Sequence, residues 1–339
     1  MKRGLSLLAV FFGTILTLNV LTSPVKEDQI HLSPDAPWQQ PPVEQPPSKP
    51  LIRPPKITTQ VPGWLNNDQT VSQLKTWHQE APDLTEVGVY GKSSNGKDVH
   101  YIKIEADHGN DEIKPIVLIT ACIHGNEPLS ASTVMGYIGT MLGQYGKDDT
   151  VTKLVDSRIL YFVPIVSPDS YPRSRRVDGV DPNRNFPTDS NPTKKSVPPV
   201  EALKKFFNRI KPHAVISGHT YGRVYLTPWG SKTRACPHNS QFQDIVGTMG
   251  KLSQYRVQRA CELYGRPIYG TEVDWYYKNG AISIVMEFGT HQRIPSQSDI
   301  ESEFNRTYKA VLHFIDRAPK VRFNERGHYS KYRFPFPSR

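Results

Sequence analysis

The sequence lacks a second long apolar segment and any short repeat. Beyond the run from Leu5 to Leu21 no stretch resembles a membrane span, and the mean hydropathy is −0.51, which excludes a protein with several transmembrane helices. No triplet or heptad pattern is visible, which excludes collagen-like and coiled-coil chains. The 339 residues fit one domain of about 250 residues with additional segments better than two full domains.

The central part of the chain also lacks a strong charge of either sign. The net charge of +10 is concentrated at the two ends, where residues 1–63 carry +2 and residues 317–339 carry +6. Residues 64–316 are left with only +2. Binding of nucleic acid requires a basic face, so we expect no nucleic-acid partner.

The N-terminus has the layout of an export signal. Two basic residues, Lys2 and Arg3, precede the apolar run Leu5–Leu21, which is either cleaved or kept as a single membrane anchor. Both outcomes place the body outside the cytoplasm, in the periplasm or at the cell envelope. Between Pro24 and Pro62 lie eleven prolines, which favour an extended spacer, with a docking segment for a proline-reading domain as the alternative. The expected organisation is a signal or anchor at 1–23, a proline-rich linker at 24–63, a catalytic domain at 64–316 and a basic, aromatic tail at 317–339.

Cysteine is scarce, with three residues in the whole chain. In an oxidising compartment Cys236 and Cys261 could form a disulfide, which would leave Cys122 free. Cys122 stands two residues before His124 and could be catalytic, although a buried cysteine in a strand is the more common case.

Apolar runs and helical stripes predict an α/β fold. Four runs are continuous rather than alternating, which is typical of strands covered on both faces. These runs are Ile116–Cys122, Ile159–Val166, Ala214–Ser217 and Ile282–Met286, and two further strands are expected at Thr85–Tyr90 and His100–Glu105. Helices are expected at Thr70–His78, Leu129–Leu142, Val200–Ile210, Gln241–Leu252 and Ile300–Ile315. The alternation predicts a mixed, mostly parallel central sheet sandwiched between helices, with functional residues at the strand ends.

Three residues at expected strand ends have the chemistry of a zinc site. His124 and Glu127 directly follow the first apolar run, and His219 follows another. Two histidines and one glutamate leave one position of a zinc ion open for water, as in catalytic rather than structural sites. Taken singly, each is also compatible with a surface turn or a buried histidine.

Two further features are suited to hydrolysis. Glu287 directly follows the strand-like run Ile282–Met286, where a carboxylate acts either as a general base or in a buried ion pair. The segment 168–187 is rich in arginine, whose planar guanidinium binds carboxylates through two hydrogen bonds. A solvated basic loop is the alternative for this segment.

Together these motifs resemble the zinc metallocarboxypeptidases of the carboxypeptidase A type, in particular their compact bacterial members. The resemblance spans about Trp64 to Phe314, and its motifs occur in the order of the family. They are His124-Gly125-Asn126-Glu127, Gly179-Val180-Asp181-Pro182-Asn183-Arg184-Asn185-Phe186, His219-Thr220-Tyr221, Pro228-Trp229-Gly230, Asp274-Trp275 and Glu287.

The resemblance implies a role for each matched residue. His124, Glu127 and His219 match the ligands of one zinc ion per chain, and Glu287 matches the general base. Asp181 matches the acid that orients the first zinc histidine, while Asn183 and Arg184 match the pair that holds the terminal carboxylate of the substrate. Arg173 and Arg176 match a pair whose first member polarises the scissile carbonyl and whose second belongs to the substrate site. Tyr264 and Tyr269 both qualify as the mobile tyrosine of the family, and Glu272-Val273 stands where the side-chain pocket is partly defined.

The expected function is that of an exported zinc carboxypeptidase that removes a C-terminal residue from peptides. Peptidoglycan peptides of the γ-D-glutamyl-diaminopimelate type are the leading special substrate implied by the resemblance. A zinc deacylase of N-acyl amino acids, similar to succinylglutamate desuccinylase or aspartoacylase, is the main alternative, and a non-catalytic wall-binding module is a weaker one. The tail Lys320–Arg339 alternates cations with aromatic residues, which predicts attachment to wall polymers or lipid headgroups, or else a strand-like tail packed on the body.

Overall fold

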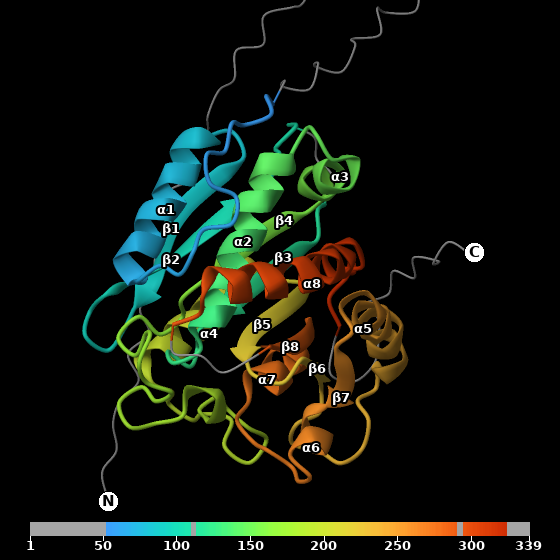
Figure 1. Cartoon of the computed structure of the whole chain (residues 1–339). Coiled ribbons are helices and arrows are strands. Elements are labelled where there is room, and N and C mark those ends of the chain that lie inside the picture. The colour runs from blue at the N-terminus through green and yellow to red at the C-terminus, as the bar shows by residue number, and fades with distance from the viewer. Residues whose placement is uncertain (1–51, 110–112, 290–293, 324–339) are drawn as a thin grey trace, which may run out of the picture. The chain divides into compact units, whose positions relative to one another are not determined.

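A computed structural model describes residues 52–109, 113–289 and 294–323 (Figure 1). The predicted export signal and most of the proline-rich segment lie outside these ranges. No helix within the described ranges combines the length and the apolar character needed to cross a bilayer.

Eight strands form one sheet in the order β1-β2-β4-β3-β5-β8-β6-β7. The four central strands β4, β3, β5 and β8 run parallel to one another, while β2 joins β4 and β6 joins β8 in antiparallel fashion. The prediction of a mixed, mostly parallel sheet is therefore confirmed. The strands are β1 (Thr85–Lys92), β2 (Asp98–Ile104), β3 (Ile116–Ala121), β4 (Ile159–Val163), β5 (Ala214–Thr220), β6 (Val224–Thr227), β7 (Arg256–Arg259) and β8 (Ile282–Phe288).

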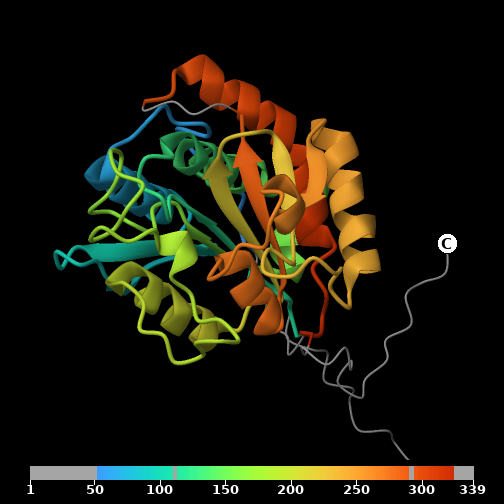
Figure 2. The same cartoon turned by 90° about the horizontal axis from the view of Figure 1, so that it is seen from below.

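Helices cover both faces of the sheet (Figure 2). In β3, Val117 and Ile119 pack into the apolar core under one helical layer, while Leu118 packs into the core on the opposite face. Burial of both faces explains why the central strands are mostly apolar instead of alternating with polar residues. The first layer comprises α1 (Asn67–Glu80), α2 (Pro128–Gln144), α3 (Asp149–Ser157), α5 (Asn239–Ser253) and α8 (Gln297–Asp316), and the second comprises α4 (Pro198–Ile210) and α7 (Glu272–Lys278).

Several element boundaries differ from the prediction. Strand β3 ends before Cys122, whose φ of 51° turns the backbone out of the sheet, and β4 ends before Pro164, which cannot donate a hydrogen bond to a ladder. The elements α3, α6 (Ala260–Leu263), α7, β6 and β7 were not predicted. Strand β7 has no buried residue and α6 spans four residues, so neither produces a clear apolar period.

Residues 52–63, called the strap below, pack on the domain instead of forming part of an extended spacer. The Trp77 indole nitrogen Nε1 donates to the Thr59 carbonyl at 2.9 Å, and Val61 packs against the main core. Gly139 in α2 permits this approach, because a Cβ there would lie 2.2 Å from the Gln60 carbonyl oxygen. The packed domain therefore begins no later than residue 52, earlier than the boundary predicted at residue 64.

The start of the predicted tail also belongs to the domain. Arg317 pairs with Asp244 at 2.7 Å, and Phe323 is buried and stacks on His238 with 4.1 Å between ring centroids. The alternative of a packed tail therefore holds for residues 317–323, whose contacts bury one of the aromatic residues once expected to bind a surface. The remainder, 324–339, lies outside the described residues.

The three cysteines are free thiols and are buried. The disulfide considered for Cys236 and Cys261 is not formed. The Cys122 thiol donates to the Glu127 carbonyl at 3.1 Å, and burial raises its pKa to about 12. A thiol that stays protonated at neutral pH is not a nucleophile, so Cys122 has a structural role.

Candidate functional site

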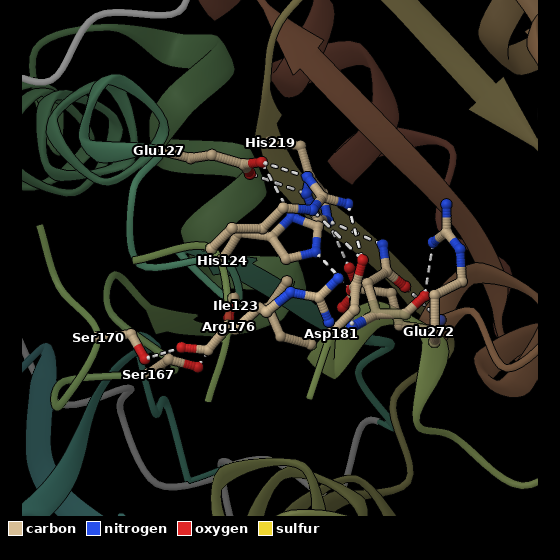
Figure 3. Close-up of polar contacts among 12 residues, drawn as sticks. Ile123, His124, Glu127, Ser167, Ser170, Arg176, Asp181, His219 and Glu272 are labelled. Atoms are coloured by element: carbon tan, nitrogen blue, oxygen red, sulfur yellow. Dashed lines mark hydrogen bonds and ion pairs between the residues drawn. The ribbon is translucent and has the colours of Figure 1, made fainter. Parts of the chain in front are cut away.

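The ends of parallel strands bring the three predicted metal ligands together at one edge of the sheet (Figure 3). His124 follows β3, Glu127 lies immediately before α2, and His219 is the next-to-last residue of β5. Their potential ligand atoms all lie within 4.8 Å of one another, and all three residues are buried. Within the described ranges this is the one group of acids, histidines or cysteines with such an arrangement.

The carboxylate of Glu127 lies between the two histidine rings. Its Oε1 is 2.9 Å from His124 Nδ1, and its Oε2 is 2.9 Å from His219 Nδ1. Burial alone would raise the pKa of Glu127, but the two histidines outweigh it and lower the pKa to about 2. The group therefore offers an ionised carboxylate and two Nδ1 atoms directed at one point, a donor set that suits zinc and leaves a coordination position open.

A carboxylate also lies behind each histidine. Asp181 Oδ1 is 3.0 Å from His124 Nε2, as the resemblance implied, and Glu272 Oε1 is 2.5 Å from His219 Nε2, which was not predicted. Burial lowers the pKa of His219, but the carboxylates of Glu127 and Glu272 outweigh it and hold that pKa well above its usual value. A metal ion would have to displace this proton, so metal binding and proton release are coupled here.

Glu287 lies in the neighbouring strand at the same level as His219. The two residues are partners in the register of β5 and β8, and Glu287 is only 8% exposed. Burial raises the pKa of its carboxyl to about 7. None of the described lysines, arginines or histidines lies within ion-pair distance of it, so the alternative of a buried ion pair is not formed there. A carboxyl with this pKa can take up and release protons near neutral pH.

Asn183 and Arg184 lie on the short 3₁₀ turn Pro182–Arg184, next to His219. The Asn183 side-chain oxygen accepts from the Glu272 backbone at 2.9 Å, which turns the amide nitrogen Nδ2 toward His219 Nε2, 3.5 Å away. The Arg184 guanidinium donates to the Asn183 carbonyl at 2.7 Å and lies over the Tyr264 ring, 5.4 Å from its centroid. Of the two candidate tyrosines, Tyr264 thus contacts the predicted carboxylate-binding pair.

Tyr269 lies on the wall of a cavity of about 230 Å³ that also includes Thr271 and Asp274. Its side chain is 59% exposed. The structure therefore separates the two tyrosines by their surroundings, where the sequence left both open.

The structure brings Arg175 to the ligand group, and it brings neither Arg173 nor Arg176 there. Arg175 lies 3.6 Å from Glu127 Oε1 and 3.0 Å from Asp181 Oδ2. Arg173 is exposed and has no ion pair with the described residues, while Arg176 donates to the Gly179 carbonyl at 3.1 Å and so closes its own loop. The Arg-x-x-Arg spacing selected Arg173 and Arg176. Spacing in the sequence does not predict where each side chain points in an irregular loop.

Comparison with known proteins identifies the family. The sequence model of the zinc carboxypeptidase family matches residues 70–310, a range that includes all three candidate ligands and Glu287. The chain belongs to the zinc carboxypeptidase family. Zinc carboxypeptidases depend on a zinc ion, and the donor set of His124, Glu127 and His219 fits one such ion per chain.

Individual zinc carboxypeptidases are similar to this chain at low identity. Carboxypeptidase SOL1 of Arabidopsis thaliana is 22% identical over 275 residues, which cover 75% of this chain and 55% of that protein. Carboxypeptidase A4 of Mus musculus is 24% identical over 237 residues, which cover 59% and 56%. The chain thus spans about half the length of these relatives. The crystal structure of carboxypeptidase A from Helicoverpa armigera has a TM-score of 0.64 at 16% identity, covering 75% of this chain and 73% of that one, and shares its fold.

Proposed function

We propose that this zinc carboxypeptidase hydrolyses the C-terminal peptide bond of peptides. The observation that carries the proposal is the buried His124–Glu127–His219 group with Glu287 beside it on the adjacent strand. Around it lie a candidate carboxylate-binding pair and a cation. A hydrolase that acts at a chain end requires a metal site with a general base, a binding site for the terminal carboxylate and a cation that stabilises charge on the carbonyl oxygen.

The metal ligands, Glu287 and Arg175 have separate roles in the proposed reaction. A zinc ion held by His124, Glu127 and His219 would polarise the substrate carbonyl and make a bound water more acidic. Glu287, with a pKa raised to about 7 by burial, accepts the proton of the attacking water and returns it to the departing amine. Arg175 is close enough to the ligand group to stabilise negative charge on the carbonyl oxygen, so we assign to it the role first expected of Arg173.

Recognition of the terminal carboxylate belongs to Asn183 and Arg184. The oxygen of the Asn183 side chain is already used by the Glu272 backbone, so only its amino group is left to donate to a substrate. Arg184 adds a charged donor that Tyr264 holds in place from one face of the guanidinium. A substrate with a free α-carboxylate satisfies both donors, whereas an amidated C-terminus does not.

Export and a peptidoglycan substrate are further parts of the proposal. They are supported by the basic and apolar N-terminal segment in the sequence and by the resemblance to compact bacterial members. An exported enzyme of this specificity would meet wall peptides such as γ-D-glutamyl-diaminopimelate. Attachment to a membrane or wall through residues 1–51 or 324–339 belongs to the same proposal.

Product profiling by mass spectrometry tests these assignments. The purified chain is incubated with a peptide library, the same peptides amidated at the C-terminus, muropeptides and N-acyl amino acids, each with and without a zinc chelator. Release of single C-terminal residues from free peptides, lost on amidation and on chelation, supports the proposal. Preferential cleavage of N-acyl amino acids would instead favour the zinc deacylase. No turnover of any class would contradict both.

A further inference from the structure

Glu272 is a buried acid whose contacts are unlike those of a specificity residue. It is the first residue of α7 and its side chain is fully buried, at 0% exposure. Its Oε1 lies 2.5 Å from His219 Nε2, and its backbone nitrogen donates to Asn183 Oδ1 at 2.9 Å. One contact is with the metal group and the other with the proposed carboxylate-binding pair, although the sequence position suggested a role in the side-chain pocket.

The surroundings of Glu272 exclude direct contact with the nearby cavity. That cavity, of about 230 Å³, is lined by Thr271 and Asp274 on either side of Glu272 in the sequence, but not by Glu272. Val273, the other residue of the pair, packs in an apolar cluster with Leu226. The helix therefore turns the acid inward to His219 and leaves its neighbours to face the cavity.

Glu272 has few polar partners. Among the described residues His219 is its one ion-pair partner, and its second oxygen, Oε2, is buried without a hydrogen-bond partner. A buried carboxylate with so few partners costs stability. Its placement is therefore better explained by what it does for His219 than by a contribution to folding.

The two histidines have matching arrangements. In each ring Nδ1 faces Glu127 and Nε2 faces a carboxylate, Asp181 for His124 and Glu272 for His219. A neutral imidazole carries a proton on one nitrogen only, so an acceptor at Nε2 leaves the lone pair of Nδ1 free for a metal. The acceptor also fixes the ring plane and increases the basicity of the ligand.

We propose that Glu272 is a positioning residue of the metal centre, which holds His219 in the metal-binding tautomer and orientation as Asp181 does for His124. The proposal rests on the proposed function, because it takes the His124–Glu127–His219 group as the zinc site. It also couples two parts of the active site: the backbone of Glu272 fixes Asn183 while its side chain fixes His219. The carboxylate-binding amide and the metal ligand are thus held by one residue.

Zinc affinity tests the proposal without reliance on turnover. Apparent Kd values and zinc release rates are measured by competition with a chromophoric chelator for the parent chain, Glu272→Gln and Glu272→Leu. Removal of such an outer carboxylate typically weakens metal binding about 10- to 100-fold. We expect a loss of zinc affinity of about tenfold for Glu272→Gln, because its amide oxygen can still accept from Nε2. For Glu272→Leu we expect a loss of about 100-fold.

Asp274→Asn is the matched control. Asp274 is a buried acid on the same helix, but it accepts from the backbone nitrogens of Gly230 and Ser231 at 2.8 and 2.9 Å and does not contact His219. Its loss should lower the melting temperature and leave the zinc Kd within about twofold of the parent. Thermal unfolding of each metal-free variant confirms that the affinity is measured on folded protein.

The outcomes separate this proposal from the proposed function. If the parent binds one zinc and hydrolyses peptides while Glu272→Leu keeps the parent Kd, the role of Glu272 is refuted and the function stands. An equal loss of affinity in Asp274→Asn would also refute it, because the effect would then belong to the placement of the whole helix. If the parent binds no zinc, the function itself is contradicted.

Discussion

The pH dependence of turnover provides a direct test of Glu287 as general base. Burial raises the pKa of its carboxyl to about 7, and only the deprotonated form can accept a proton from water. For a group of this pKa the deprotonated fraction is about 90% at pH 8, about half at pH 7 and about 10% at pH 6. We therefore expect kcat/KM to fall as the pH is lowered, approaching one decade per pH unit. A bound zinc ion favours the carboxylate and moves this limb to lower pH without changing its slope.

Substitution of Glu287 should remove the limb together with the activity. Glu287→Gln keeps the shape of the side chain but cannot accept the proton, which should lower kcat/KM about 100- to 10,000-fold. This loss corresponds to about 3–5 kcal/mol of transition-state stabilisation. Zinc content and the melting temperature of the zinc-loaded protein should show that the site and the fold are intact. Glu301→Gln, the same change at an exposed position of α8, should leave kcat/KM unchanged.

The assay uses initial rates on a chromogenic peptide between pH 5 and 9, with zinc kept in slight excess. Two results would refute the reasoning. A flat kcat/KM profile across this range would show that no group that titrates between pH 5 and 9 in the zinc-loaded protein controls the reaction. Activity of Glu287→Gln within about tenfold of the parent would show that proton transfer takes place elsewhere.

Three substitutions and two truncations test the site and the segments that support it. His219→Ala should lose the single bound zinc, as measured by metal analysis; full occupancy would remove His219 from the ligand set. Arg184→Ala should raise KM for free peptides far more than it lowers kcat, and the preference over amidated peptides should disappear; an unchanged preference would contradict the role of Arg184. Gly270→Ala should destabilise the chain and impair catalysis, because a Cβ there would lie 2.6 Å from the Arg184 carbonyl and the φ of +72° is unfavourable for alanine; a parent-like melting temperature would contradict this. Truncation after Phe323 should leave turnover of soluble peptides unchanged, whereas truncation at Arg317 should lower the melting temperature, and equal melting temperatures would show that residues 317–323 add no stability.

Elements with a strong apolar signal could be predicted from the sequence. The four central strands form from continuous β-branched runs because both faces of the sheet are covered, and the ligands follow because parallel strands end at one edge. His124, Glu127, His219 and Glu287 are therefore found where the sequence placed them. The short elements β7 and α6 could not be predicted, because they lie at the periphery and bury little.

The direction of individual side chains in loops could not be predicted. Arg173, Arg175 and Arg176 stand within four positions of irregular backbone, and only the fold shows that Arg175 reaches Glu127. Glu272 carried a weak signal as an acid beside an apolar residue, but its contact is with a residue 53 positions away in the sequence. Such contacts depend on how α7 is seated against β5, which composition does not specify.

The strap was missed for a different reason. Proline-rich sequence predicts an extended chain, and residues 52–63 have no regular helix or strand. The sequence feature that indicates the strap lies in α2, the helix on which the strap packs. Gly136, Gly139 and Gly143 recur along α2 at positions where glycine weakens a helix. Glycines on one side of a helix interior indicate that something approaches its backbone closely.

The strap also fixes where the preceding chain joins the domain. It runs antiparallel to α2, with Val61 near Gly136 and Pro54 near Gly146 (Figure 1). Glu127 caps the other end of this helix, and a helix of 17 residues is about 25 Å long. A label or solid support attached at the first residues of the strap would therefore lie at the end of α2 opposite Glu127 and the metal group. Attachment at this point would leave the end of α2 that carries Glu127 open to large or insoluble substrates.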